Sequence, residues 1–235
     1  MATPKPVLTY LDARMLAEPV RLALFIGEVD FEDERIDYAE VARRRDAGLL
    51  PFGQVPVLTL KGEKLTQSGA LLRWAGKQSD LLPASDELYC DSIECALADV
   101  RTLLRPLWYS NVLGRHPLTG SATAESMISL TEAQLEATAS SLNDEILPLK
   151  FQALERNIKG DFFCGDNMTV CDISWYCICI GLLQNFYCPK VNADKVLRDC
   201  PKLVAIAFAV HDHPRVALWN RQHNYDEPFV HPRRP

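Results

Sequence analysis

The chain lacks long apolar segments and carries no excess of basic charge. In its 235 residues no run approaches the roughly 18 consecutive apolar residues that a helix needs to span a bilayer. The formal net charge of −6 argues against nucleic acid as a partner, because a phosphate-binding surface is normally basic. Residues 1–6 lack the apolar core of a secretion signal, so we expect a cytoplasmic protein that does not associate with membranes.

Cysteine is absent from the first 89 residues. All eight cysteines come later, at positions 90, 95, 164, 171, 177, 179, 188 and 200. We expect no disulfide framework, because a chain of this length with 48% hydrophobic residues can form a core without one. Cys177 and Cys179 do not form a Cys-x-x-Cys motif and no histidine cluster accompanies them, so we expect free thiols and no metal site.

Residues 50–58, LPFGQVPVL, place a Val-Pro bond directly before an apolar strand. Because proline lacks an N–H, the strand must begin there or leave that backbone edge open. Shortly after it, Gln67 and Ser68 open a predicted helix, where unpaired N–H groups and the helix dipole favour a carboxylate. An open backbone edge beside an anion-binding helix start indicates a pocket for a small, extended peptide with an acidic end.

The predicted elements fall into two groups along the chain. Strands are predicted at 7–11, 31–36, 56–60 and 64–66, and helices at 14–27, 38–45 and 67–77. After a linker at 81–85 only helices are predicted, at 86–115, 122–156, 170–186, 193–200 and 201–211. The predicted fold class is α+β: a β-α-β-α-β-β-α domain (residues 1–83), an all-helical domain (86–225) and a C-terminal tail (226–235).

One helix start is predicted from side-chain chemistry alone. Thr169 is placed to cap the N–H of Asp172, while the Asp172 carboxylate reaches back. Met168 can pack on Ile173 as a hydrophobic staple. Residues 173–180, ISWYCICI, are apolar nearly all round, which predicts the buried central helix of the second domain.

Four short motifs lie in order in the first part of the chain: LTY at 8–10, AEPVR at 17–21, LPFGQVPVL at 50–58 and QS at 67–68. With these motifs, residues 7–83 resemble the N-terminal, thioredoxin-like half of the cytosolic glutathione transferases, and most closely the sigma class. The likeness continues weakly to about residue 220 and so covers most of the chain. It implies a homodimer that uses glutathione as co-substrate, without a metal or organic cofactor.

The resemblance implies roles for the residues of a glutathione site. Tyr10 would donate its O–H to the glutathione sulfur and favour the thiolate, which is the nucleophile. Val55 would pair its backbone with the cysteinyl unit, and a cis Val55-Pro56 bond would leave that backbone exposed. Gln67 and Ser68 would hold the γ-glutamyl carboxylate at the helix start.

Two positions depart from the sigma pattern. Where the family usually has a Trp and a Lys, four residues apart, at the glycyl carboxylate, this chain has Val41 and Arg45. Arg45 can bind a carboxylate bidentately, but no tryptophan is available. Leu16 stands where the family often has a second arginine, which alters the polarity expected beside the thiolate.

The remaining site residues also follow from the resemblance. Gln54 would border the glutathione cleft, and Asp99 matches the family's aspartate that reaches glutathione bound in the other subunit. The electrophile site would lie between the domains, in a mainly apolar setting suited to hydrophobic electrophiles. It would comprise Leu11, Arg14, Met15, Leu107, Trp108 and Tyr109.

The sequence therefore predicts a glutathione transferase that conjugates hydrophobic electrophiles. A thiol-disulfide oxidoreductase shares the half-fold, but the first domain has no cysteine to carry that chemistry. A prostaglandin-D-synthase-like isomerase on the same scaffold is left open. A catalytically weak, crystallin-like structural or binding protein also remains an alternative, although Tyr10, Gln67 and Ser68 argue against it.

Overall fold

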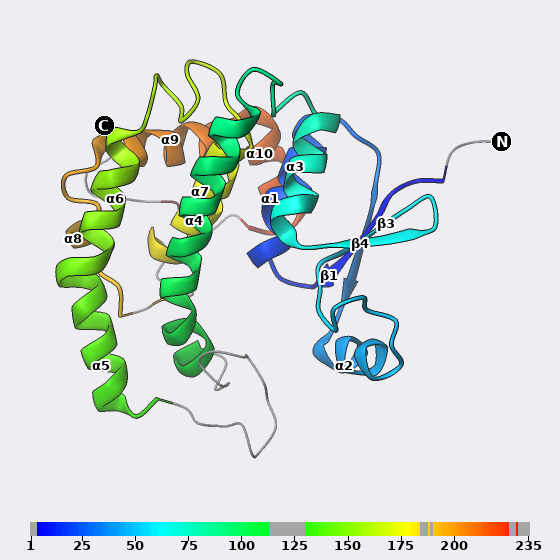
Figure 1. Ribbon diagram of the computed structural model, residues 1–235, viewed down its shortest axis with the longest axis horizontal. Coiled ribbons are helices and arrows are strands. Elements are labelled where there is room, and N and C mark those ends of the chain that lie inside the picture. The colour runs from blue at the N-terminus through cyan, green and yellow to red at the C-terminus, as the bar shows by residue number, and fades with distance from the viewer. Residues whose placement is uncertain (1–3, 113–129, 184–187, 189, 226–228, 230–235) are drawn as a thin grey trace. The chain divides into compact units, whose positions relative to one another are not determined.

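The computed structural model describes residues 4–112, 130–183, 188, 190–225 and 229 (Figure 1). Its contacts define two compact units, Met1–Glu87 with Pro214–His223 and Leu88–His213 with Asn224–Pro235. The described strands all belong to the first unit, and the described elements of the second are helical. The predicted α+β class is confirmed.

A four-stranded sheet forms the centre of the first unit. Its strands, in the order β2-β1-β3-β4, are β1 (Val7–Leu11), β2 (Glu32–Ile36), β3 (Val57–Leu60) and β4 (Glu63–Thr66). β1 is parallel to β2 and antiparallel to β3, and β3 and β4 form the predicted hairpin. Three helices complete the predicted thioredoxin-like order, with α1 and α3 side by side (Figure 1): α1 (Glu18–Ile26), α2 (Tyr38–Asp46) and α3 (Ser68–Gln78).

The core of this unit explains why polar residues of α1 need partners inside the protein. Leu8, Val57 and Leu58 of the central strands are almost completely buried. Residues 18–24 of α1 are all buried as well. Glu18 and Arg21 are charged members of this enclosed segment, and buried charges are stable only when paired or hydrogen-bonded.

α10 (Pro214–Gln222) was not predicted from the sequence, and by its contacts it belongs to the first unit. The ring centroids of Trp219 and Phe25 lie 5.0 Å apart, so α10 packs on α1. Val216 and Trp219 are both buried and three residues apart, a helical spacing that could have predicted this element. The chain thus returns to the first unit near its end, whereas its sequence predicts one helical domain over 86–225.

The second unit is built from helices in its described part. They are α4 (Glu87–Leu107), α5 (Glu132–Ser141), α6 (Leu147–Arg156), α7 (Val170–Leu183), α8 (Ala193–Val196) and α9 (Pro201–Asp212). π-Helical turns follow α4 (Trp108–Val112) and join α5 to α6 (Leu142–Ile146). None of the described helices combines the length and hydropathy needed to cross a membrane.

Two predicted helices differ from these elements. The single helix expected at 122–156 is interrupted before α6, where Pro148 lacks the N–H for an intrahelical bond; residues 122–129 lie outside the described part. The helix expected at 193–200 ends at Val196, four residues before Cys200. Pro201 begins the next helix, α9.

Over residues 170–182 α7 is buried except at Cys177, which is partly exposed, as its apolar sequence predicts. The Trp175 indole N–H donates to the Leu203 carbonyl at 2.7 Å. The same ring meets Phe151 of α6 edge-on, with centroids 5.3 Å apart. α7 therefore packs against α9 and, through Trp175, against α6, as the central helix of this unit should.

The start of α7 uses the predicted residues, with their roles partly exchanged. The Asp172 carboxylate reaches back as predicted and accepts from the N–H groups of Thr169 at 2.7 Å and Phe163 at 2.9 Å. The Thr169 hydroxyl donates to the same carboxylate at 2.8 Å, and the Asp172 N–H donates to the Thr169 carbonyl at 3.1 Å. The prediction that the hydroxyl caps this N–H was wrong, because a hydroxyl beside a carboxylate acts as the donor.

Thr169→Ala should lower the free energy of unfolding by about 1 kcal/mol, and by at most roughly 2, because Asp172 loses one of its three donors. Chemical denaturation followed by circular dichroism measures the change. Thr102→Ala is the matched control, since the Thr102 hydroxyl donates to the Ala98 carbonyl at an exposed position of α4, and we expect little change there. An unaltered unfolding midpoint for Thr169→Ala would contradict the role of its hydroxyl.

Candidate active site

Tyr10 lies near the end of β1 with only 4% of its surface exposed. After β1 the chain turns back through Met15, whose φ is 47°, and a 3-10 turn at Met15–Ala17. This turn brings the N–H of Leu16 to the Tyr10 hydroxyl, which accepts a hydrogen bond at 3.4 Å. A phenol oxygen that accepts an N–H becomes a stronger O–H donor, which suits it to stabilise a neighbouring anion.

The buried guanidinium of Arg21 holds the loop that follows β1. Arg21 is 0% exposed and donates to the carbonyls of Ala13 at 2.6 Å and Leu11 at 3.2 Å. Its Nε also donates to Asp33 of β2 at 2.8 Å. Because these bonds tie α1 to β2 and to the loop, Arg21 positions the turn that carries the Leu16 N–H.

Glu18 links the same loop to α10. Arg14 Nε donates to Glu18 at 3.1 Å, and Arg21 lies 3.6 Å from the other carboxylate oxygen. From α10 the Trp219 indole donates to Glu18 at 3.0 Å, and Asn220 accepts from Arg14 at 3.2 Å. Of this group, only Arg14 was predicted as a site residue, and Glu18 and Arg21 entered only as part of the AEPVR motif; the spacing of the three along one helical face was the available signal.

The loop before β3 has the predicted cis Val55-Pro56 bond, and that prediction is confirmed. Gln54 is exposed and Val55 is half-buried. The loop turns at Gly53, whose φ of +67° suits glycine, and a Cβ there would lie 3.4 Å from Cγ of Arg45. The Arg45 stem therefore packs beside the loop that carries the predicted peptide-binding backbone.

The three arginines at the end of α2 have different partners. Arg43 donates to Glu40, and Arg44 donates to both Glu40 and Glu34. These hydrogen bonds, first that of Arg43 and then that of Arg44, lower the pKa of Glu40 to about 2. Within the described part of the chain, Arg45 donates to its exposed neighbour Asp46 at 3.2 Å, and its side chain is half exposed. Its guanidinium can exchange this neighbour for a ligand carboxylate at small cost.

Gln67 and Ser68 form the start of α3. Gln67 is exposed and has a φ of 74°, a left-handed conformation that is unfavourable for a residue with a side chain. Within the described chain its side chain makes no capping bond to α3. Ser68 is the first helical residue, in the turn whose N–H groups have no intrahelical acceptor. Together these features are typical of an anion-binding helix start.

The predicted electrophile-site residues are divided between the two units. Leu11, the last residue of β1, and Met15, in the turn that follows it, are both half-buried in the first unit. In the second unit Trp108 and Tyr109 are half-buried, with ring centroids 4.8 Å apart, whereas Leu107 is 1% exposed. Their grouping into one site stays a prediction.

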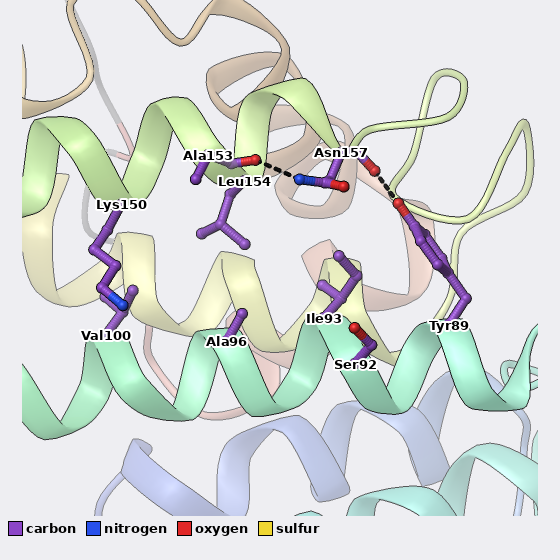
Figure 2. Close-up of a pocket in the computed structure, with 9 residues that line it drawn as sticks. All are labelled: Tyr89, Ser92, Ile93, Ala96, Val100, Lys150, Ala153, Leu154 and Asn157. Carbon is purple, nitrogen blue, oxygen red and sulfur yellow. Dashed lines mark hydrogen bonds between the residues drawn. The ribbon is translucent and has the colours of Figure 1, made fainter.

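Asp99 is exposed on α4, and its carboxylate lies 3.9 Å from Nζ of Lys150 on α6. Lys150 lines a pocket of about 210 Å³ between these helices (Figure 2). At the opposite end of the pocket the Tyr89 hydroxyl donates to the Asn157 carbonyl. The Tyr89 hydroxyl is the phenol of this lining and already donates to a backbone carbonyl, so it is not placed to activate a bound thiol.

Comparison with known proteins identifies the family. Residues 6–76 match the model for the N-terminal domain of glutathione S-transferase, and residues 122–223 match the model for its C-terminal domain. Glutathione S-transferase 1 of Ascaris suum is 31% identical over 225 residues, which cover 90% of this chain and 98% of the relative. Glutathione S-transferase 4 of Caenorhabditis elegans is 28% identical over 198 residues, covering 83% and 88%. The chain belongs to the glutathione S-transferase family.

Solved structures share the whole fold. Prostaglandin synthase D of Nilaparvata lugens matches with a TM-score of 0.73 and 23% identity, over 94% of this chain and 99% of that one. A monomeric glutathione S-transferase of the hookworm Necator americanus also gives 0.73 at 23% identity, covering 97% and 99%. Because identity is this low, these structures establish the fold alone.

Proposed function

We propose that this protein is a homodimeric, sigma-like glutathione transferase that ionises the glutathione thiol and adds it to hydrophobic electrophiles. The observation that carries the proposal is the buried Tyr10 hydroxyl near the end of β1, which accepts the N–H of Leu16. Glutathione is the co-substrate, and this chemistry needs neither a metal nor an organic cofactor.

Tyr10 supplies the step that makes the thiol reactive. A free thiol with a pKa of about 8.5 is only a few per cent ionised at neutral pH. An O–H that donates to the sulfur stabilises the thiolate, and each unit of lowered thiol pKa is worth about 1.4 kcal/mol. The thiolate then attacks the electrophilic carbon; a C–S bond forms, and either a leaving group departs or the acceptor takes a proton from water.

Three features would hold the tripeptide in register with Tyr10. The Val55 backbone pairs with the cysteinyl unit as an added strand would, with Gln54 bordering the cleft. Gln67 and Ser68 receive the γ-glutamyl carboxylate at the start of α3. Arg45 takes the glycyl carboxylate in the absence of the family's tryptophan.

The second substrate would meet an apolar surface. Leu16, which replaces an arginine of the sigma pattern, is 37% exposed while its N–H contacts Tyr10. With Leu11 and Met15 beside it, this loop favours apolar electrophiles over charged ones. The aromatic pair Trp108 and Tyr109 would complete the site from the helical unit.

Retention on immobilised glutathione, followed by an activity panel, tests the proposal. We expect retention, elution by free glutathione, and conjugation of an aromatic halide such as chlorodinitrobenzene. The panel includes glutathione-dependent isomerisation of a prostaglandin endoperoxide, because the same thiolate could serve the isomerase. Retention without any activity would favour the crystallin-like alternative, and failure to bind glutathione would contradict the proposal.

An exposed aromatic side chain supports the proposed dimer. Phe52, in the loop before β3, is 68% exposed. Large aromatic side chains often anchor protein interfaces, where they fill a pocket of the partner. Phe52 therefore gives the first unit a candidate anchor for a second copy of the chain.

Asp99→Ala should weaken glutathione binding about fivefold while the dimer persists, because Asp99 would contact glutathione in the partner subunit and exposed ion contacts contribute about 1 kcal/mol. Calorimetric titration measures the affinity, and sedimentation measures the assembly. Lys150→Ala is the control: it removes the neighbour of Asp99 but keeps its carboxylate, so affinity should be retained. A wild-type monomer that binds glutathione normally would remove the basis of this prediction.

A further inference from the structure

Three cysteines from distant parts of the sequence meet in the second unit. Cys90 lies in α4, Cys171 in α7, and Cys164 in the segment between α6 and α7. Their Sγ atoms all lie within 4.8 Å of one another, and those of Cys90 and Cys164 are 2.9 Å apart. All three are free thiols in the structure. We refer to these three residues as the cysteine cluster.

The cysteine cluster is enclosed on one side and accessible on the other. Cys90 and Cys171 are buried, and the Cys171 S–H donates to the Cys90 carbonyl at 3.1 Å. Cys164 is partly exposed, and its sulfur lies 3.8 Å from the Thr169 hydroxyl. An ion could therefore reach the buried sulfurs past Cys164.

Positive charge lies close to this site. Nζ of Lys159 is 3.4 Å from the ring centroid of Tyr89, the residue that precedes Cys90. Lys159 also belongs to the segment that carries Cys164, where its N–H donates to the Phe163 carbonyl at 3.2 Å. A cation here reduces the cost of placing several thiolates together.

Core packing alone explains part of this arrangement. A buried cysteine behaves as a small apolar side chain, which accounts for Cys171 on a helix that is apolar nearly all round. It does not account for Cys164, which is partly exposed and still directs its sulfur to the two buried ones. Convergence of three sulfurs on one volume is the property that a metal site requires.

We propose that the cysteine cluster binds one thiophilic d10 cation, Zn²⁺ or Cu⁺, through its three sulfurs. Metal–sulfur bonds of about 2.3 Å place three ligand sulfurs about 4 Å apart, so Cys90 and Cys164 need to separate by about 1 Å. Soft thiolates select these ions over Mg²⁺ or Ca²⁺, which prefer oxygen ligands. The site is independent of the proposed transferase reaction.

Two properties of the site favour different ions within this class. The net charge of three thiolates with a divalent ion is −1, and with a monovalent ion it is −2. Because the buried Asp172 lies beside the cluster, the smaller negative charge favours Zn²⁺. Coordination favours Cu⁺, because structural Zn²⁺ sites have four ligands and the described residues of the cluster supply three. Water entering beside Cys164 would complete a Zn²⁺ site.

Metal titration of the untagged full-length protein tests the proposal. The protein is reduced with a phosphine, exchanged into anaerobic buffer, and titrated with Zn²⁺, with Cd²⁺ as its ultraviolet-absorbing substitute, and with Cu⁺ against a chromophoric chelator. We expect one equivalent of Zn²⁺ or of Cu⁺ per chain, and a sulfur-to-Cd²⁺ charge-transfer band if the Zn²⁺ arm is correct. The ion that gives one equivalent identifies the occupant. Absence of stoichiometric binding in both arms overturns the proposal.

Serine variants assign the binding to these sulfurs. Cys164→Ser and Cys171→Ser should each weaken metal binding about a hundredfold or more. Cys95→Ser is the control: Cys95 is exposed on α4, the helix that also carries Cys90, and its loss should leave metal binding unchanged. Cys164 is partly exposed, so Cys164→Ser remains informative if the buried Cys171→Ser does not fold. Binding that survives Cys164→Ser or is lost in Cys95→Ser overturns the assignment. The proposal is also overturned if Cys90 and Cys164 form a disulfide and the protein binds no metal after that disulfide is reduced.

Discussion

Tyr10→Phe should reduce turnover about tenfold to a hundredfold near neutral pH while glutathione affinity changes little. The variant keeps the ring and deletes the one O–H that the mechanism aims at the sulfur. Loss of a hydrogen bond to a charged group is worth about 1.5–3 kcal/mol, which sets this range. Because the proposed glutathione contacts at Val55, Gln67 and Ser68 are untouched, the loss should fall on turnover.

The pH dependence makes this prediction specific. Without the donor the bound thiol pKa should rise toward its free value, so activity should recover in part as hydroxide ionises the thiol. Titration of the bound thiolate's ultraviolet absorbance against pH, in both proteins, measures the shift directly. Tyr38→Phe is the control, since it deletes a hydroxyl from an exposed position on α2. Identical titration curves for wild type and Tyr10→Phe would make Tyr10 a packing residue and Arg14 the next candidate donor.

Arg21→Leu should lower the free energy of unfolding by about 3–5 kcal/mol, the cost of breaking a buried ion pair by removing one partner. Arg21 is completely buried; its loss leaves Glu18 without one cation and leaves Asp33 with Arg35 as its remaining charged donor. The Ala13 carbonyl loses its Arg21 donor at the same time, whereas the Leu11 carbonyl keeps the N–H of Ala13. The folded fraction should also turn over more slowly, because the loop that these bonds position carries the Leu16 N–H to Tyr10.

Urea denaturation, analysed at a common slope, measures the loss of stability. Arg43→Leu is the matched control, because Arg43 pairs with Glu40 on the exposed side of α2 and its removal should leave the midpoint nearly unchanged. If Arg21→Leu does not fold, Arg21→Lys keeps the charge but not the fork of donors, and we expect a midpoint below that of wild type. Equal midpoints for the Arg21 and Arg43 variants would show that the buried network contributes no stability.

Much of the fold follows from short stretches of sequence. The hairpin of β3 and β4 was predicted from two strand-like runs around Gly62, and the helical character of α1 from apolar spacing. α7 was predicted as the buried helix because it is apolar nearly all round. These signals are readable because strand and helix periods, proline and glycine act between residues close in the chain.

The candidate site was predictable only in part. The cis Val55-Pro56 bond was predicted from motifs that resemble a known family, and the anion-binding helix start at Gln67 and Ser68 from the chemistry of a helix N-terminus. The bond from the Leu16 N–H to Tyr10 was not predicted, although the residues are six apart, because it depends on the left-handed turn at Met15. No spacing rule for helices or strands describes such a loop.

By itself the sequence determined the order of the elements, the buried character of α7 and the family motifs, since each depends on local spacing or a short run of residue types. Only the tertiary structure decided which distant residues meet: Asn220 with Arg14, 206 positions apart, and Cys90 with Cys164, 74 apart. The same holds for the packing of α10 on the first unit. Such contacts cannot be read from local spacing. The entropic cost of closing a loop rises only slowly with its length, so residues far apart in the sequence can meet.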